Sequence, residues 1–140
     1  MRFWDTSAIL PLCLEESHTP VLRELALADG ALTIWWGTPT ECHSAFARLR
    51  REERLTPAEE DGLRELLACL GGAWTEIAQS VEVRTIAGRL LLRHPLRAAD
   101  ALQLAAALVW AGRSPSGERF VCLDQRLREA ARMEGFVVEP

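Results

Sequence analysis

The sequence has 140 residues, of which 49% are hydrophobic and 26% are charged, so it is long enough for one domain with its own core. It carries 16 basic residues, all of them arginine, against 20 acidic ones, and the net charge of −4 argues against a simple basic coat for nucleic acid. The absence of lysine excludes a phosphate-binding loop that requires lysine, and any lysine nucleophile.

No apolar run is long enough to span a membrane, and Asp5 interrupts the apolar start too early for a secretory signal. We therefore expect a cytoplasmic protein. The four cysteines form no C-x-x-C pair, and the three histidines have no metal-ligand spacing. Disulfides, zinc and histidine-based catalysis are accordingly not expected.

The predicted elements alternate between strands and helices along the chain. We expect strands at 2–4, 32–35, 74–77, 120–123 and 136–138. We expect helices starting at 6 and at 57, and over 19–28, 38–54, 80–93, 97–111 and 125–133. This alternation predicts a single α/β domain over 1–140, with a mainly parallel central sheet covered by helices on both faces.

Two of the predicted helices begin with the same pattern. In Thr38-Pro39-Thr40-Glu41, Thr38 is the expected N-cap and Glu41 completes a capping box. Thr56-Pro57-Ala58-Glu59 repeats the pattern, and Gly71-Gly72 supplies the end of that helix. These adjacent helices predict an αα-hairpin.

The stretch from Arg97 to Leu108 is rich in alanine and leucine and is apolar nearly all round, as a helix in the interior of a fold would be. Asp100 is the one carboxylate near its start. It either interacts favourably with the positive end of the helix dipole or belongs to a functional site.

Four acidic residues lie at the beginnings of predicted helices, and at least three of them lie where a parallel sheet places its ligands, beyond the carboxyl ends of the strands. Asp5 and Asp124 follow strands, whereas Glu41 and Asp100 open helices. Each also has a structural interpretation, as a helix cap, a capping-box residue or a dipole partner.

Convergence of these acids would require a counter-charge. Two carboxylates about 4 Å apart repel by roughly 4 kcal/mol at an effective dielectric near 20. A divalent cation removes this cost, and carboxylate oxygens with room for water suit Mg²⁺ or Mn²⁺ better than zinc. Such a centre performs phosphoryl chemistry.

These motifs, in this order, resemble those of PIN-domain ribonucleases, and most closely those of VapC toxins from toxin–antitoxin pairs. The resemblance covers essentially the whole chain. It rests on Asp5-Thr6-Ser7-Ala8, Thr40-Glu41, the stretch from Leu96 to Ala105, the stretch from Phe120 to Leu127, and the ending Ala130-Ala131 with Gly135-Phe136-Val137.

The resemblance implies a metal site made by Asp5, Glu41, Asp100 and Asp124, with Asp5 and Asp100 as direct Mg²⁺ ligands and the other two binding metal or orienting water. It further implies an RNA substrate, a VapB-type antitoxin and a homodimer. Many relatives carry Thr or Ser at the position of Cys122, so the sequence lacks a supporting hydroxyl there. Thr6 and Ser7 are expected to cap a helix or to hydrogen-bond the site.

Two surfaces are candidates for partners. Four arginines could flank the RNA or form a solvated helix face with Glu52 and Glu53; they are Arg48, Arg50, Arg51 and Arg54. The predicted hairpin and the Trp35-Trp36 pair could serve a homodimer or an antitoxin segment, or the tryptophans could simply fill the core.

Three other functions are compatible with the sequence. A metal-dependent phosphatase of the haloacid-dehalogenase type could also use Asp5, but Ser7 occupies the position of its second aspartate. A catalytically inactive PIN-like module that binds RNA or protein would keep the fold without the chemistry. In a purely structural α/β protein the four acids would serve only as caps.

Overall fold

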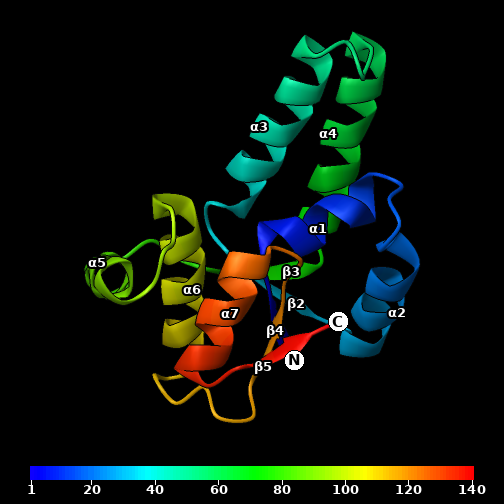
Figure 1. Ribbon diagram of the computed structural model, residues 1–140. Coiled ribbons are helices and arrows are strands. Elements are labelled where there is room, and N and C mark those ends of the chain that lie inside the picture. The colour runs from blue at the N-terminus through cyan, green and yellow to red at the C-terminus, as the bar shows by residue number, and fades with distance from the viewer.

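Five short strands form one all-parallel sheet in the spatial order β3-β2-β1-β4-β5 (Figure 1). The computed structural model describes residues 1–140. The strands are β1 (Arg2–Trp4), β2 (Leu32–Trp35), β3 (Trp74–Ile77), β4 (Arg119–Val121) and β5 (Val137–Glu139). In the central strand β1, Trp4 is in register with Ile34 of β2 and with Val121 of β4.

Seven helices connect and cover the strands, as the alternating pattern predicted. They are α1 (Thr6–Cys13), α2 (Thr19–Asp29), α3 (Thr38–Arg51), α4 (Pro57–Gly71), α5 (Val81–Arg93), α6 (Ala98–Trp110) and α7 (Gln125–Glu134). None of them combines the length and the apolar character needed to span a bilayer.

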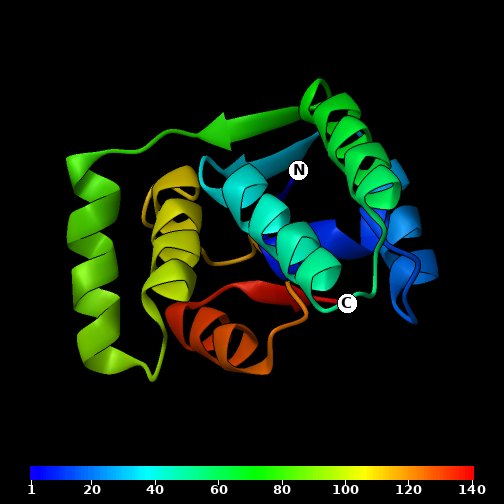
Figure 2. The same ribbon diagram turned by 90° about the horizontal axis from the view of Figure 1, so that it is seen from above.

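The sheet is buried on both faces because successive side chains of a strand point in opposite directions. Phe3 packs in a core with α5, α6 and α7, whereas the next residue, Trp4, packs in a second core with the first four helices. Both side chains are fully buried. Burial of an apolar side chain of this size contributes about 1.5–3 kcal/mol. Figure 2 shows the outermost layer, where α5 lies along α6.

Most predicted boundaries agree with the structure to within a few residues, and α3 shows why the rest differ. The helix ends at Arg51 rather than at 54. The Glu52 amide donates back to the Arg48 carbonyl, and Glu53 then adopts a left-handed conformation with φ of 57°. This backbone reversal starts the turn toward α4.

The predicted αα-hairpin is confirmed, and α3 and α4 extend away from the rest of the molecule (Figure 1). The capping box at the start of α4 is also as predicted, because the Thr56 hydroxyl accepts from the Glu59 amide and the Glu59 carboxylate accepts from the Thr56 amide. Glu60 joins the two helices: its carboxylate pairs with Arg50 of α3 and with Arg64 of α4.

The two adjacent tryptophans have different surroundings. Trp35 is the last residue of β2 and is 6% exposed, so it belongs to the core. Trp36 lies outside the strand and is 51% exposed. The core interpretation is therefore correct for Trp35, and the surface interpretation stays open for Trp36.

Candidate active site

All four predicted acids lie at one edge of the sheet. Asp5 directly follows β1, and Asp124 follows β4 as the residue before α7. Glu41 is in the first turn of α3 and Asp100 is in the first turn of α6. Because every strand is parallel, their carboxyl ends and the helix N-termini that follow them meet at this edge.

Asp5 is held rigidly at the start of α1. Its Oδ2 accepts hydrogen bonds from the Ser7 amide at 3.0 Å and from the Ser7 hydroxyl at 2.5 Å, and the Cys122 thiol lies 3.5 Å away. No protein group donates to Oδ1, which leaves that oxygen available to a ligand. The residue is 4% exposed, and this burial raises the pKa of Asp5, with a further contribution from the charge of Asp100.

Ser7 also ties the two aspartates at strand ends together. Besides donating to Asp5, its hydroxyl accepts from the Leu123 amide at 2.8 Å and from the Asp124 amide at 3.3 Å. Asp124 itself caps α7, since its Oδ1 accepts from the Leu127 amide at 2.9 Å. The capping roles of Asp5 and Asp124 therefore coexist with their position in a shared cluster.

Glu41 is linked to the rest of the site by Gln103, a residue that the sequence analysis did not single out. The Gln103 amide nitrogen lies 2.7 Å from the Thr6 hydroxyl, 3.0 Å from the Thr38 hydroxyl and 3.2 Å from Glu41 Oε1. Gln103 is 1% exposed and joins α1, α3 and α6. It is the only polar side chain between Asp100 and the end of α6, and this isolation was the available sequence signal.

The predicted capping box at the start of α3 is wrong. The N-cap is Gly37, and it makes no side-chain cap bond. The Thr38 hydroxyl and the Glu41 carboxylate both turn toward Gln103 instead. Thr6 likewise contributes its hydroxyl to this network rather than to a helix end.

Burial gives Glu41 unusual acid–base properties. It raises the pKa of Glu41 to about 7, and the charges of Asp5 and Asp100 act in the same direction, whereas hydrogen bonds from Thr6 and Gln103 oppose the shift. Glu41 consequently changes protonation near neutral pH. A group of this kind is suited to proton transfer.

Asp100 lies in the more open part of the site. Its Oδ2 accepts from the Arg97 amide at 3.3 Å, which is the expected contact for an acid in the first turn of a helix, while Oδ1 accepts no hydrogen bond. Partial burial raises the pKa of Asp100, and the charge of Asp124 adds to the effect. Asp5, Glu41 and Asp100 are thus close enough for the charge of one to raise the pKa of another.

The arrangement fits a hydrated Mg²⁺ better than a fully protein-coordinated ion. No three His, Cys, Asp or Glu side chains are gathered closely enough to enclose a metal. Mg²⁺, however, is usually bound through one or two carboxylates, with waters and phosphate completing its shell. Asp5 and Asp100 each keep an Oδ1 without a donor, and none of the four acids forms an ion pair with a basic side chain.

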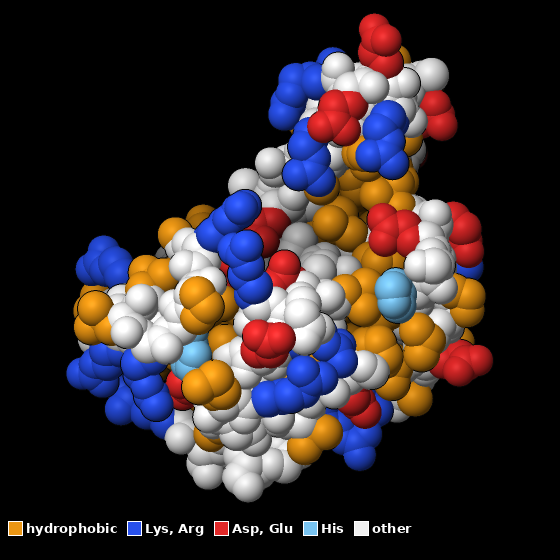
Figure 3. All heavy atoms as spheres, viewed as in Figure 1, with side chains coloured by type: hydrophobic (Ala, Val, Ile, Leu, Met, Phe, Trp, Pro, Cys, Tyr) orange, Lys and Arg blue, Asp and Glu red, His pale blue; other side chains and the backbone are white.

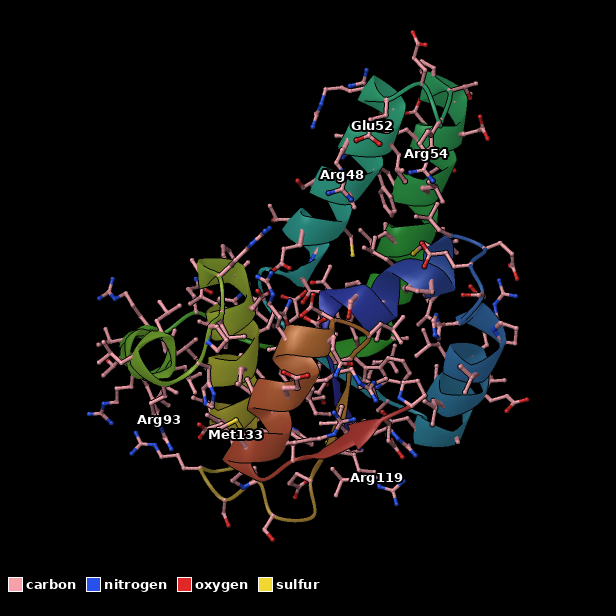
Figure 4. All side chains as sticks on the ribbon, viewed as in Figure 1. Arg48, Glu52, Arg54, Arg93, Arg119 and Met133 are labelled. Carbon is pink, nitrogen blue, oxygen red and sulfur yellow. The ribbon has the colours of Figure 1, made fainter.

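The arginines predicted to flank RNA lie on the protruding hairpin, where Figure 4 shows Arg48, Glu52 and Arg54. Two of the four are engaged within the protein: Arg50 pairs with Glu60, and Arg54 lies 3.9 Å from Glu52. Only the contact between Arg54 and Glu52 is the kind that the solvated-face interpretation expects, because Arg50 pairs with Glu60 instead. Arg48 and Arg51 make no ion pair.

The elements define an α/β fold with a five-stranded parallel sheet and seven helices, which matches a PIN-like fold. The structure is similar to the crystal structure of FitAcB from Neisseria gonorrhoeae, with a TM-score of 0.66 over 99% of this chain and 96% of that chain. At 17% sequence identity, this likeness establishes the fold. The sequence itself matches no protein-family model and no curated protein sequence.

Proposed function

We propose that this protein is a Mg²⁺-dependent endoribonuclease that hydrolyses RNA phosphodiester bonds, and that it is the toxin of a type II toxin–antitoxin pair. One observation carries the proposal. Asp5, Glu41 and Asp100 meet at the carboxyl edge of the sheet, none of them forms an ion pair, and all three have raised pKa values. A purely structural cluster would be expected to pair its carboxylates directly with basic side chains.

Asp5 and Asp100 are the proposed ligands of the ion, through the oxygens that accept no hydrogen bond. When bound, Mg²⁺ supplies positive charge that stabilises the phosphate in the transition state and makes water a better nucleophile. Mn²⁺ has the same preference for carboxylate and water oxygens and is the expected substitute. Glu41 and Asp124 are proposed to bind the ion or to orient water.

Glu41 accounts for one of the two proton transfers. In hydrolysis the water oxygen bonds to phosphorus, the bond from phosphorus to the leaving oxygen breaks, and the leaving oxygen gains a proton from solvent. Glu41 can accept the proton of the attacking water, because burial keeps its pKa at about 7. Gln103 fixes the direction of the Glu41 carboxylate, and Ser7 fixes that of Asp5.

The resemblance to VapC toxins supports an antitoxin partner and a homodimer. Two exposed apolar side chains are consistent with a contact surface: Trp36, beside the end of β2, is 51% exposed, and Leu92, on α5, is 88% exposed. Single exposed apolar residues are common on monomers, so the partner remains part of the proposal rather than a property of the fold.

Cleavage of single-stranded RNA with Mg²⁺ or Mn²⁺ tests the proposal. We expect Asp5→Asn and Asp100→Asn to lower the rate by about 100-fold or more, because even changes to groups that only orient metal ligands cost about 10–100-fold. Asparagine keeps the capping ability of aspartate, so the fold should survive. Asp61→Asn on the exposed surface of α4 is the matched control and should cleave at the parental rate.

The same experiment separates the alternatives. A protein that binds RNA but cleaves none in either metal is the inactive binding module. A protein that releases phosphate from a phosphomonoester and leaves RNA intact is the phosphatase. Parental cleavage rates in both aspartate variants would refute the proposed site.

A further inference from the structure

A small charged pocket lies beside the acids. It is formed between the N-terminal ends of α6 and α7 and has a volume of about 290 Å³. Its lining consists of Arg97, Asp100, Asp124 and Arg126, with no apolar side chain. A pocket of this composition suits a small charged group rather than an apolar ligand.

The two arginines in this pocket have no partner within the protein. Arg97 and Arg126 both favour the ionised form of Asp100, so they lie within range of its charge, yet neither guanidinium forms a hydrogen bond or an ion pair. By contrast, Arg50 and Arg64 both pair with Glu60, and Arg113 pairs with Glu82. Each of the two free guanidiniums therefore has all five N–H donors available to a ligand.

The charges of the chain and of the two arginines indicate which class of ligand the pocket binds. The chain has a net charge of −4 and would repel RNA unless cationic groups near the site compensated. A guanidinium presents two parallel donors that match the two free oxygens of a phosphodiester. Figure 3 shows basic side chains lying over acidic ones in the hollow where α6, α7, α1 and α3 come together.

We propose that Arg97 and Arg126 form a phosphate clamp that holds the RNA backbone directly beside Asp100. This inference rests on the proposed ribonuclease function and adds the substrate-binding residues to it. It assigns RNA contact to the start of α6 and α7, and not to the arginines of the hairpin. Asp100 and Asp124 line the pocket together with the two arginines, so the clamp and the proposed metal ligands are neighbours with distinct tasks.

RNA binding without cleavage tests the clamp. Fluorescence anisotropy of a labelled single-stranded RNA, in EDTA, should show Kd at least 10-fold higher for the double variant Arg97→Gln/Arg126→Gln. The slope of log Kd against log salt should fall by about 0.7 if both side chains hold one phosphate, and by about 1.4 if each holds its own. Arg89→Gln/Arg132→Gln is the matched control: both residues are exposed and form no ion pair.

A second measurement distinguishes a clamp from simple charge balance or misfolding. Loss of two positive charges beside Asp100 should raise the affinity for Mn²⁺ in a calorimetric titration, while the affinity for RNA falls. The variant Arg97→Lys/Arg126→Lys keeps the positive charges but lacks the two parallel donors of each guanidinium. It should therefore recover part of the RNA affinity that Arg97→Gln/Arg126→Gln loses.

Equal RNA affinity and equal salt slopes in the clamp variant and the control variant would overturn the inference. Loss of RNA and Mn²⁺ binding together would also overturn it, because that result indicates a collapsed site. Either result could occur while the parent still cleaves RNA, so the clamp can fail without the proposed ribonuclease activity. Conversely, if the parent binds RNA through these arginines but does not cleave it, the clamp is supported and the proposed ribonuclease activity is refuted.

Discussion

Gln103 shows how one side chain can organise a site that is spread over the chain. Its amide nitrogen reaches α1 through Thr6 and α3 through Thr38 and Glu41. Its own Oε1 is buried without a donor. A buried acceptor left unsatisfied costs about 1–3 kcal/mol, so the position is kept at a cost to stability. This cost is understandable if the amide serves to orient Glu41.

We expect Gln103→Leu to raise the pKa of Glu41 above its present value of about 7, because the variant removes a hydrogen bond that stabilises the ionised carboxylate. The net change in unfolding free energy should be small, because the Thr6 and Thr38 hydroxyls lose a partner while the unsatisfied Oε1, which costs about 1–3 kcal/mol, is removed. Carboxyl-carbon NMR titration without divalent cations measures the pKa. Leu104→Met, at the buried neighbouring position, should leave it unchanged.

Glu41 also makes stability depend on pH. Its pKa is about 7 in the folded chain against an ordinary 4.5, so between these values the folded protein binds more protons than the unfolded one. Stability from this group is therefore present below pH 4.5 and is lost as the pH rises through 7.

In EDTA, we expect the Tm of the parent to fall relative to that of Glu41→Gln by about 2–6 °C between pH 5 and pH 8. Mg²⁺ should restore the parent's Tm at pH 8 and have much less effect at pH 5, where Glu41 is protonated. Differential scanning calorimetry measures both effects. If the Tm of the parent and the Tm of Glu41→Gln changed with pH in the same way, the pKa of Glu41 would not be raised in the folded protein.

At the level of secondary-structure elements, local sequence predicted one capping box correctly and one wrongly. Thr56 and Glu59 lie on an exposed hairpin, where no other partner competes, and they form the expected reciprocal bonds. Thr38 and Glu41 carry the same pattern, but Gln103, distant in the sequence, takes both side chains. The local pattern around Thr38 and Glu41 gives no sign of this tertiary contact, although Gln103 is marked in the sequence as the lone polar side chain in that part of α6.

The α3–α4 hairpin depends on Glu60. Hydrogen bonds from Arg64, and the contact with Arg50, lower the pKa of Glu60, so the group stabilises the hairpin above its ordinary pKa and ceases to do so as the pH falls. We expect Glu60→Gln to increase amide hydrogen exchange in the outer turns of α3 and α4 about 10-fold or more. Glu65→Gln, an exposed change on α4, should leave the exchange unchanged.

At the level of the whole molecule, the alternation of strands and helices was sufficient to predict a parallel sheet with both faces covered. Asp5 and Asp124 could be placed at one edge because each follows a strand. The strand order could not be predicted, since short apolar strands such as β1 and β4 contain nothing that specifies their neighbours. The sequence could likewise not predict that Arg97 and Arg126 are unpaired, because this depends on how the N-terminal ends of α6 and α7 approach each other.

The proposed homodimer is a property of the whole molecule as well. Light scattering should give a mass of two chains, each of 15.6 kDa. Trp36→Glu places a charge on the half-exposed indole position beside β2 and should shift the protein toward one chain, whereas Leu27→Glu, at an 85% exposed position on α2, should not. A single-chain mass for the parent across concentrations would remove the dimer from the proposal.

The central claim is that carboxylates distant along the chain share one divalent ion, and calorimetric titration with Mn²⁺ tests it most directly. At pH 7.5 we expect saturable binding to the parent and to Asp61→Asn, and its loss in both Asp5→Asn and Asp100→Asn. Saturable binding of equal strength in all four proteins, or none in the folded parent, would contradict the claim.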